Sequence, residues 1–278
     1  MKRKVLKRRV LKVCITLVLI LGLGVMGYAG YQLYETDQTY REGNAVYENL
    51  NDRIKKSAPV HSAQTQTVEA TEIAFPQSRD QDQDQDEEQP RVYIPEFEID
   101  FEALRSVNKD AAAWLYAPGT VIDYPVMEAE DYYYYLNHLV DGTVNANGSL
   151  FIDYNNAPDF SGPLTVIYGH HMKSGAMFGG LKGYKEQAYF DENPYMYLYT
   201  DQDSYRIDLM YGCVIAAGQW SEKAFMYEEN AGELMEYARQ NTTFQSNVEF
   251  KEGDRIVALS TCSYEFNDAR YVVLGILR

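Results

Sequence analysis

The chain has 278 residues, of which 46% are hydrophobic, so it can bury a core and is not disordered throughout. Its formal net charge is −16, from 25 Lys and Arg against 41 Asp and Glu, and affinity for phosphate backbones needs clustered basic residues. No nucleic acid is therefore expected as a partner. One main domain with appendages suits this length.

The first predicted element is a membrane span. Residues 1–12 are a basic terminus with seven Lys and Arg, and residues 13–34 open with an uncharged run, VCITLVLILGLGVMGYAGY. This run is long enough to cross roughly 30 Å of hydrocarbon, and the basic residues before it predict a cytoplasmic N-terminus, a single pass through membrane lipid and an extracellular body. A cleaved signal peptide is the alternative, because GYAGYQ offers small residues near a cut. We favour an uncleaved anchor, since the run is longer than a usual signal core.

Residues 35–91 are predicted to be an extracellular stalk helix followed by an acidic, flexible spacer. Val46, Leu50 and Ile54 recur every four residues, which indicates an amphipathic helix that either packs on the domain or acts as a stalk. From residue 57 to 89 the chain is rich in Gln, Asp, Ser and Thr and has little to bury, so we interpret it as an extended tether. Its alternating aspartates lack the glycine and terminal glutamate of a calcium loop, and no metal site is predicted.

The folded domain is predicted to span residues 92–278. Its first element is a helix, because apolar residues between Phe101 and Leu115 lie at helical spacing. The sequence APGT then ends this helix with a proline and a glycine.

Most of the remaining elements are predicted to be strands. Seven short runs are rich in β-branched and aromatic residues and are separated by Gly, Pro, Asn and Asp clusters: VIDYPV, GSLFIDY, PLTVIYGH, MYLYT, YRIDLMYGCVIAAG, RIVALSTC and RYVVLGIL. They predict a mostly β fold, a closed or nearly closed barrel of seven to eight strands. A helix is predicted within AFMYEENAGELMEYARQN, between the fifth and sixth runs.

The three cysteines fall in different surroundings. Cys14 lies in the apolar span and is predicted to be an ordinary apolar position. Cys213, in LMYGCVIAAG, is predicted to be an inert thiol of the core. A disulfide between Cys213 and Cys262 is the alternative, although their spacing is not that of a small secreted framework.

The last two predicted strands form a hairpin that carries two chemically useful side chains. One strand ends at Cys262, a loop of seven residues follows, and the next strand begins near Arg270. This arrangement sets the two side chains near each other at one rim, on rigid elements. Arg270 stays protonated and cannot act as a base, but it can donate hydrogen bonds to a developing oxyanion.

A thiol at this rim needs a partner, because only the thiolate is a good nucleophile and the free pKa is ~8.5. Of the four histidines, His170 and His171 end the run LTVIYGHH. Neighbouring strand residues point to opposite faces, so at most one of the two faces a shared site. A nucleophilic Cys262, one histidine as acid and base, and Arg270 would support acyl transfer through a thioester. A purely structural interpretation of all three remains the alternative.

Neighbours of the cysteine are candidate substrate contacts. Alternation puts Ser260 on the same face as Cys262, so its hydroxyl is predicted to touch substrate, whereas Thr261 faces the other way and packs. Tyr264 and Glu265, in the loop beside the site, are predicted to shape specificity. An ordinary packed or solvated role is the alternative for each of these residues.

These residues resemble a known family. LSTC closing a strand, Arg270 beginning the next, and YGHHM ending an earlier one resemble the sortases, cysteine transpeptidases of Gram-positive bacterial surfaces. NKDAAAWLYAPGTVIDYPVM, YYLNH, GSLFIDY and MFGGLKGY resemble the class B branch, as does a helix from about Glu228 to Gln240 before the cysteine strand. The resemblance covers roughly residues 101–278.

The resemblance implies roles and partners. Cys262 would be the nucleophile, His170 the acid and base, and Arg270 the stabiliser, with no direct role for His171. The substrates would be secreted surface proteins whose C-terminal sorting signal, with a Pro-x-Thr core, is cleaved after Thr. An amine of the peptidoglycan precursor or cross-bridge would then resolve the thioester, and no cofactor is expected.

Three alternatives stay open. A cysteine protease or amidase would use the same residues with water as acceptor. A surface binding module would keep the fold without turnover. A pilin-polymerising sortase is a closer rival, although such enzymes often carry a lid segment and a second membrane helix, whereas this sequence ends just after its last predicted strand.

Overall fold

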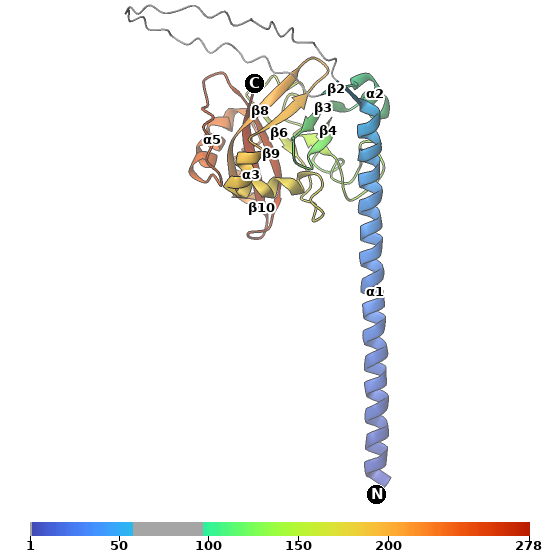
Figure 1. Cartoon of the computed structure of the whole chain (residues 1–278). Coiled ribbons are helices and arrows are strands. Elements are labelled where there is room, and N and C mark those ends of the chain that lie inside the picture. Colours follow the sequence, from blue (N-terminus) through green and yellow to red (C-terminus); the bar gives the residue numbers. More distant parts are fainter. Residues whose placement is uncertain (1, 58–96) are drawn as a thin grey trace, which may run out of the picture.

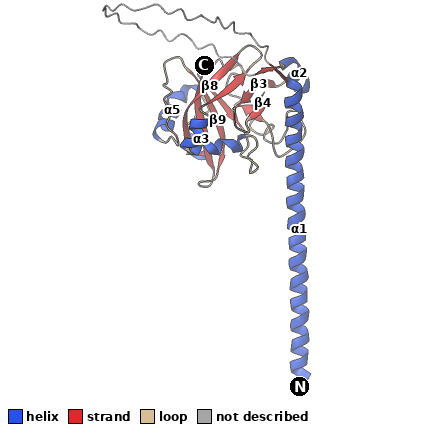
Figure 2. Cartoon of the chain, viewed as in Figure 1, coloured by secondary structure: helices blue, strands red, loops and turns tan. Residues whose placement is uncertain are grey.

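A computed structural model describes residues 2–57 and 97–278, with a long helix standing beside a β-barrel (Figure 1). The barrel closes from eight strands in the order β10-β8-β7-β3-β4-β5-β6-β9. Helices lie outside the red strands (Figure 2). The closed, mostly β barrel confirms the predicted fold class.

The elements have the following bounds. The barrel strands are β3 (Ala111–Tyr116), β4 (Asp123–Glu128), β5 (Leu150–Ile152), β6 (Leu164–Tyr168), β7 (Tyr195–Tyr199), β8 (Ser204–Ala216), β9 (Arg255–Ser263) and β10 (Ala269–Leu277). A separate antiparallel pair consists of β1 (Lys55–Ser57) and β2 (Phe97–Ile99). The helices are α1 (Lys2–Ile54), α2 (Phe101–Val107), α3 (Gln187–Glu192), α4 (Ala217–Glu222) and α5 (Ala231–Gln240), with 3-10 helices η1 (Phe178–Lys185) and η2 (Glu228–Asn230).

The seven predicted runs correspond to β4–β10, but the single helix predicted from Phe101 onward is wrong beyond Val107. The chain is extended at Asn108, whose side-chain amide donates to the carbonyl oxygen of Val140 at 2.8 Å. After this turn AAAWLY forms β3, which pairs with β4 and β7. A short, almost fully buried apolar run suits either a strand or a helix, and cross-strand pairing decides for the strand here.

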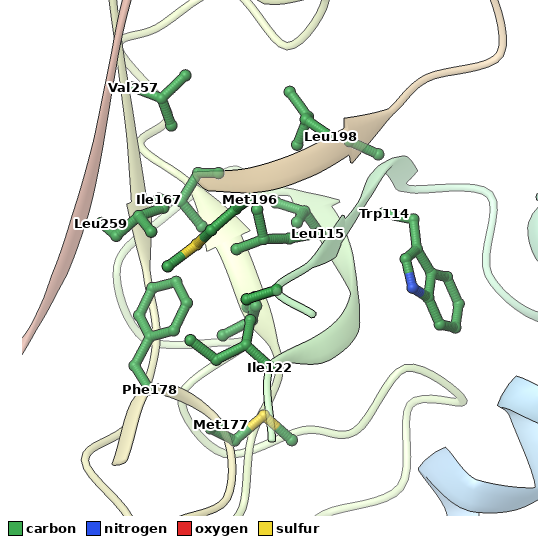
Figure 3. Close-up of a cluster of buried hydrophobic side chains, with 14 of the residues drawn as sticks. Trp114, Leu115, Ile122, Ile167, Met177, Phe178, Met196, Leu198, Val257 and Leu259 are labelled. Atoms are coloured by element: carbon green, nitrogen blue, oxygen red, sulfur yellow. The ribbon is translucent and has the colours of Figure 1, made fainter. Parts of the chain in front are cut away.

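Two buried clusters hold the barrel from its two sides. Inside lie apolar side chains from many strands, among them Leu115, Ile167, Met196, Leu198, Val257 and Leu259 (Figure 3). Outside, α4 and α5 pack over β8–β10 through residues such as Trp220 and Leu234, so the predicted inserted helix is found. Each large side chain buried in this way stabilises the fold by about 1.5–3 kcal/mol. Strands β9 and β10 are therefore packed on both faces.

Helix α1 joins the apolar N-terminal segment to the domain without a break. From Leu17 it contains a stretch long and apolar enough to cross a membrane, which is compatible with a single-pass anchor. Near its end Leu50 and Ile54 are 3% and 0% exposed, so the predicted amphipathic part packs on the domain. Residues 58–96, which include nearly all of the predicted spacer and the predicted domain start, lie outside the described residues.

Candidate active site

The β9–β10 hairpin brings a thiol and a guanidinium together. Its register places Arg270 directly opposite Cys262, as the sequence predicted. Nη1 of Arg270 donates a hydrogen bond to Sγ of Cys262 at 3.4 Å. Cys262 is partly exposed and carries a free thiol. The pair therefore combines an accessible thiol with a fixed positive charge at one end of the barrel.

His170 reaches the same end of the barrel from β6. Strands β6 and β9 are parallel neighbours, and Tyr168 pairs with Ser260. His170 follows Tyr168 by two residues, as Cys262 follows Ser260, so parallel pairing carries the histidine to the level of the cysteine. The pairing of two strands far apart in sequence is thus what assembles the histidine with the thiol.

Gly169 keeps the two strands close where the histidine begins. Its N–H donates to the carbonyl oxygen of Ser260 at 3.2 Å, and the hydroxyl of Thr261 donates to the carbonyl oxygen of Gly169 at 2.7 Å. A Cβ at this position would overlap the side chains of Leu150 and Phe178. Only glycine therefore fits here without displacing a neighbour.

The imidazole of His170 is oriented by a backbone group. Its Nε2 lies 2.7 Å from the carbonyl oxygen of Leu136. A carbonyl only accepts, so Nε2 carries the hydrogen and Nδ1 is the nitrogen available to exchange a proton. Leu136 stands in YYLNH, and sequence reasoning did not assign it a role because a backbone carbonyl leaves no residue-type signal.

His171 lies behind the site. Its Nδ1 donates to the carbonyl oxygen of Cys262 at 2.8 Å, and its ring meets Tyr264 edge-on at 5.1 Å between centroids. Only His170 of the two lines the cavity in front of the thiol, which fits the predicted opposite facing of the pair. His171 therefore holds the backbone of Cys262 and does not contact its sulfur.

A cavity of about 410 Å³ contains all three predicted catalytic residues. Its wall includes Cys262, His170, Arg270 and Ser260 beside the aromatic rings of Tyr132, Tyr133, Phe151, Tyr168 and Trp220. A larger cavity, of about 660 Å³, lies around Arg105, Asp201 and Arg255 and contains none of the predicted residues. We place the site in the smaller cavity because the free, partly exposed thiol of Cys262 lines it.

The aromatic wall is organised by a buried carboxylate. Asp153 is fully buried and accepts hydrogen bonds from the hydroxyls of Tyr168 at 2.8 Å and Tyr132 at 3.1 Å. Nε1 of Trp220 donates to the Tyr168 hydroxyl at 3.3 Å. Burial, and next the charge of Asp153, raise the pKa of Tyr168, so its hydroxyl stays protonated as a donor. Sequence reasoning quoted Asp153 only within GSLFIDY and missed this role.

The predicted substrate contacts divide into two groups. Ser260 is 1% exposed, lines the cavity and has no hydrogen-bond partner for its hydroxyl among the described residues. Tyr264 is 68% exposed, and Glu265 binds Lys185 and Ser263, and neither residue lines the cavity. Burial raises the pKa of Glu265, but hydrogen bonds from Lys185 and Ser263 outweigh burial and lower it to about 2.

Cys213 has no such surroundings. Cys213 is 0% exposed on β8, and burial raises the pKa of its thiol to about 12, which confirms the predicted inert core thiol. It is also a free thiol. Within the described ranges, no group of three or more His, Cys, Asp or Glu side chains is able to hold a metal ion.

The sequence of this chain is similar to those of known proteins. A family profile described as the sortase domain matches residues 115–277. The chain belongs to the sortase family. Sortase B of Listeria monocytogenes is 30% identical to this sortase over 183 residues, which cover 65% of this chain and 74% of the relative. Sortase B of Staphylococcus aureus is 25% identical over 178 residues, 63% of this chain and 73% of the relative.

Solved structures place this sortase in class B. Sortase B of Clostridium perfringens superposes with a TM-score of 0.59 at 26% identity, covering 64% of this chain and 99% of that one. A class B sortase of Streptococcus pyogenes involved in pilus biogenesis gives a TM-score of 0.58 at 28% identity, covering 64% and 98%. The chain therefore has the class B sortase fold and is a cysteine transpeptidase of that family.

Proposed function

We propose that this sortase is anchored in the membrane, cleaves a Pro-x-Thr-type sorting signal after Thr, and transfers the protein to an amine of peptidoglycan. The supporting observation is the 3.4 Å hydrogen bond from Arg270 to the Cys262 sulfur, in a cavity that His170 also lines. The apolar N-terminal helix supports the anchored location.

The first half-reaction forms a thioester. The Cys262 thiol gives its proton to Nδ1 of His170, and Sγ attacks the carbonyl carbon of the substrate threonine. The guanidinium of Arg270 donates hydrogen bonds to the developing oxyanion. The C–N bond then breaks, and the leaving amine takes a proton from Nδ1 of His170. The released peptide is the segment after Thr.

The second half-reaction exchanges the sulfur for nitrogen. An acceptor amine attacks the thioester carbon and gives a proton to Nδ1 of His170. The C–S bond breaks, and the departing sulfur takes that proton from Nδ1. The product is a new amide between the threonine carbonyl and the acceptor, and Cys262 and His170 return to their starting states. No oxidant, reductant or metal ion enters this balance.

The buried hydroxyl of Ser260 is proposed to bind the substrate backbone. It lies two residues before Cys262 on the same strand, and an unsatisfied buried hydroxyl costs about 1–3 kcal/mol until a ligand pairs with it. Tyr264 and Glu265, at the outer edge, are proposed to shape the approach to the cavity. Proximity to the cysteine loop supports this second assignment.

Pilin polymerisation is the second candidate. The Streptococcus pyogenes neighbour involved in pilus biogenesis has 28% identity and a similar fold, which favours testing it. The two candidates differ in the acceptor: polymerisation requires an amine of a second pilin, whereas wall anchoring requires an amine of peptidoglycan.

The test uses the full chain in detergent with peptides that vary around Pro-x-Thr, with and without a glycine-based or a lysine-based amine. We expect cleavage after Thr, with an amine-dependent shift from hydrolysed to amide product. Cys262→Ala should lose cleavage below detection, whereas the matched control Cys213→Ala should retain it. Hydrolysis alone despite added amines would indicate a protease, and the absence of any covalent adduct on Cys262 would indicate a binding module.

A further inference from the structure

The end of α1 is part of the catalytic domain's core. Tyr47, Leu50 and Ile54 are at most 3% exposed. The Tyr47 hydroxyl donates to the carbonyl oxygen of Gly148 at 2.6 Å and lies 2.8 Å from the Ser149 hydroxyl. Burial of three large side chains with a paired hydroxyl fixes this part of the helix against the barrel.

The contact continues toward the N-terminal end of α1. The side-chain amide of Asn145 donates to the carbonyl oxygen of Thr39 at 2.9 Å, and that of Asn147 donates to Oδ1 of Asn44 at 2.9 Å. Gly43 lies so close to Asn147 that a Cβ there would overlap its side chain. The docked segment of α1 therefore extends from Thr39 to Ile54, four turns of helix.

The chain leaves α1 and returns to the domain at the same place. Lys55 forms an ion pair with Asp123, and Ser57 is the register partner of Phe97 in the β1–β2 pair. The described residues on either side of the predicted spacer, Ser57 and Phe97, are thus neighbours in one strand pair. The docked part of α1 itself connects the domain to the apolar helix.

The three catalytic candidates lie at one end of the barrel. Cys262 ends β9 and Arg270 begins β10, whereas the opposite ends of these strands pair Arg255 with Leu277. In Figure 1 the connection between β9 and β10 extends toward the N-terminal end of α1, and the C-terminus lies at the other end of the barrel. The catalytic end of the barrel therefore faces along α1 toward its apolar segment.

Only a short length of helix separates the apolar segment of α1 from the part that is docked on the domain. The first acidic residue of the chain is Glu35, and the docked segment begins at Thr39. At 1.5 Å per residue these positions are only about 6 Å apart along the axis. Tyr28, Tyr31 and Tyr34 are 67%, 55% and 62% exposed just before Glu35, the position of an aromatic belt at a membrane surface.

The β9–β10 connection itself carries exposed aromatic side chains. Tyr264 and Phe266 are 68% and 48% exposed. Exposed aromatic rings of this kind are favoured in the headgroup region of a bilayer. Three observations thus favour one partner, a lipid surface: the orientation of the barrel, the short distance along α1 between the apolar and docked segments, and the exposed rings.

We propose that docking of α1 holds the catalytic end of the barrel against the bilayer, so that the β9–β10 connection contacts the lipid headgroups and substrates enter the cavity from the plane of the membrane. This inference rests on the membrane anchoring proposed above. A domain on a long tether would instead present its cavity in any direction and at variable height.

Probe depth in vesicles tests the orientation. Full chain carrying Cys14→Ser and Cys262→Ala is labelled at Phe266→Cys or, as the matched control, at Phe250→Cys, and reconstituted in phosphatidylcholine–phosphatidylglycerol vesicles with headgroup-quencher lipids. Phe250 has the same 48% exposure but precedes β9 at the other end of the barrel. We expect the probe at 266 to lose most of its emission and the probe at 250 to keep it. Equal quenching at both sites, or none at 266, overturns the proposal.

Insertions separate docking from tethering. A flexible Gly-Ser insertion of about 20 residues between Asp37 and Gln38 should abolish quenching at 266, because it frees the docked domain from the anchor. The same insertion between Gln77 and Ser78 should leave quenching unchanged. A loss of quenching from the second insertion would support the tether instead. Peptide cleavage by the Cys262 enzyme in detergent reports on the chemistry alone, so failure of the proposed function is distinguished from failure of this orientation.

Discussion

Two cysteines flank the same strand and show how position along a barrel sets the chemistry of a side chain. Cys213 on β8 pairs with Val272 of β10, whereas Cys262 on β9 pairs with Arg270. Cys213 is fully buried with its pKa raised to about 12, and Cys262 is partly exposed with a guanidinium nitrogen 3.4 Å from its sulfur. The thiol in the packed middle is shielded, and the thiol at the end of the strand is accessible beside a positive charge.

The distance between these two environments is small. Val272 and Arg270 are two residues apart on β10 and therefore lie on one face of the sheet. The interior and exterior clusters pack the middle of β10, and only its first residues reach the cavity. The packed strands thus form a rigid, apolar support. Two residues before Val272, where this packing ends, Arg270 lies beside the Cys262 sulfur.

Alkylation tests the difference between Cys213 and Cys262 most directly. Because its pKa is raised, the Cys213 thiol stays protonated at neutral pH, and its thiolate is far rarer than in a free cysteine. Iodoacetamide should label Cys262 in the folded chain and Cys213 only after unfolding, as measured by mass spectrometry of peptides. Rapid labelling of Cys213 in the native state would contradict the buried assignment.

Replacing the guanidinium of Arg270 tests whether this group, and not only its charge, supports turnover at Cys262. Arg270→Lys keeps the charge but loses the planar fork that can reach both sulfur and oxyanion, so kcat should fall by about 100-fold with KM little changed. Arg255→Lys, at the other end of the same hairpin, is the matched control and should change kcat less than about twofold. Equal effects of the two substitutions would mean that Arg270 acts only on folding.

Ser260→Ala should weaken peptide binding without lowering stability. The hydroxyl has no partner in the free enzyme, so its removal should leave the free energy of unfolding unchanged or raise it by up to about 1 kcal/mol. Peptide KM should rise about 3- to 10-fold if substrate supplies the partner. Thr261→Val, which loses the bond to Gly169, should instead lower stability. Urea unfolding and cleavage kinetics measure both, and an unchanged KM would exclude the contact.

The smallest expected effect concerns the loop beside the site. The pKa of Glu265 is lowered in the folded state, so its carboxylate stabilises the fold above its ordinary pKa of ~4.3, and this contribution is lost as the pH falls toward about 2. Its side chain is 37% exposed, so solvent screening limits the contribution to about 1 kcal/mol or less. Glu265→Gln should therefore lose less stability than the parent between neutral and acidic pH, as followed by thermal unfolding. A steeper loss in the variant would reverse this assignment.

The sequence predicted the parts of this molecule that depend on short-range patterns. The β9–β10 hairpin joins Cys262 to Arg270 within nine residues, and β-branched runs marked most strands. It failed at β3, because alanine-rich AAAWLY has no β-branched residues and only pairing with β4 and β7 makes it a strand. The Leu136 carbonyl, the carboxylate of Asp153 and the course of the chain after α1 depend on contacts between distant segments, which no local pattern records.

Gly169 has a consequence for how this enzyme can change over generations. The segment that carries His170 passes so close to Leu150 and Phe178 that only a residue without a side chain fits between Tyr168 and His170. A larger residue there would leave every predicted catalytic group in the protein and still displace a neighbour of the histidine. Mutational drift can therefore impair the enzyme through a residue with no chemistry of its own.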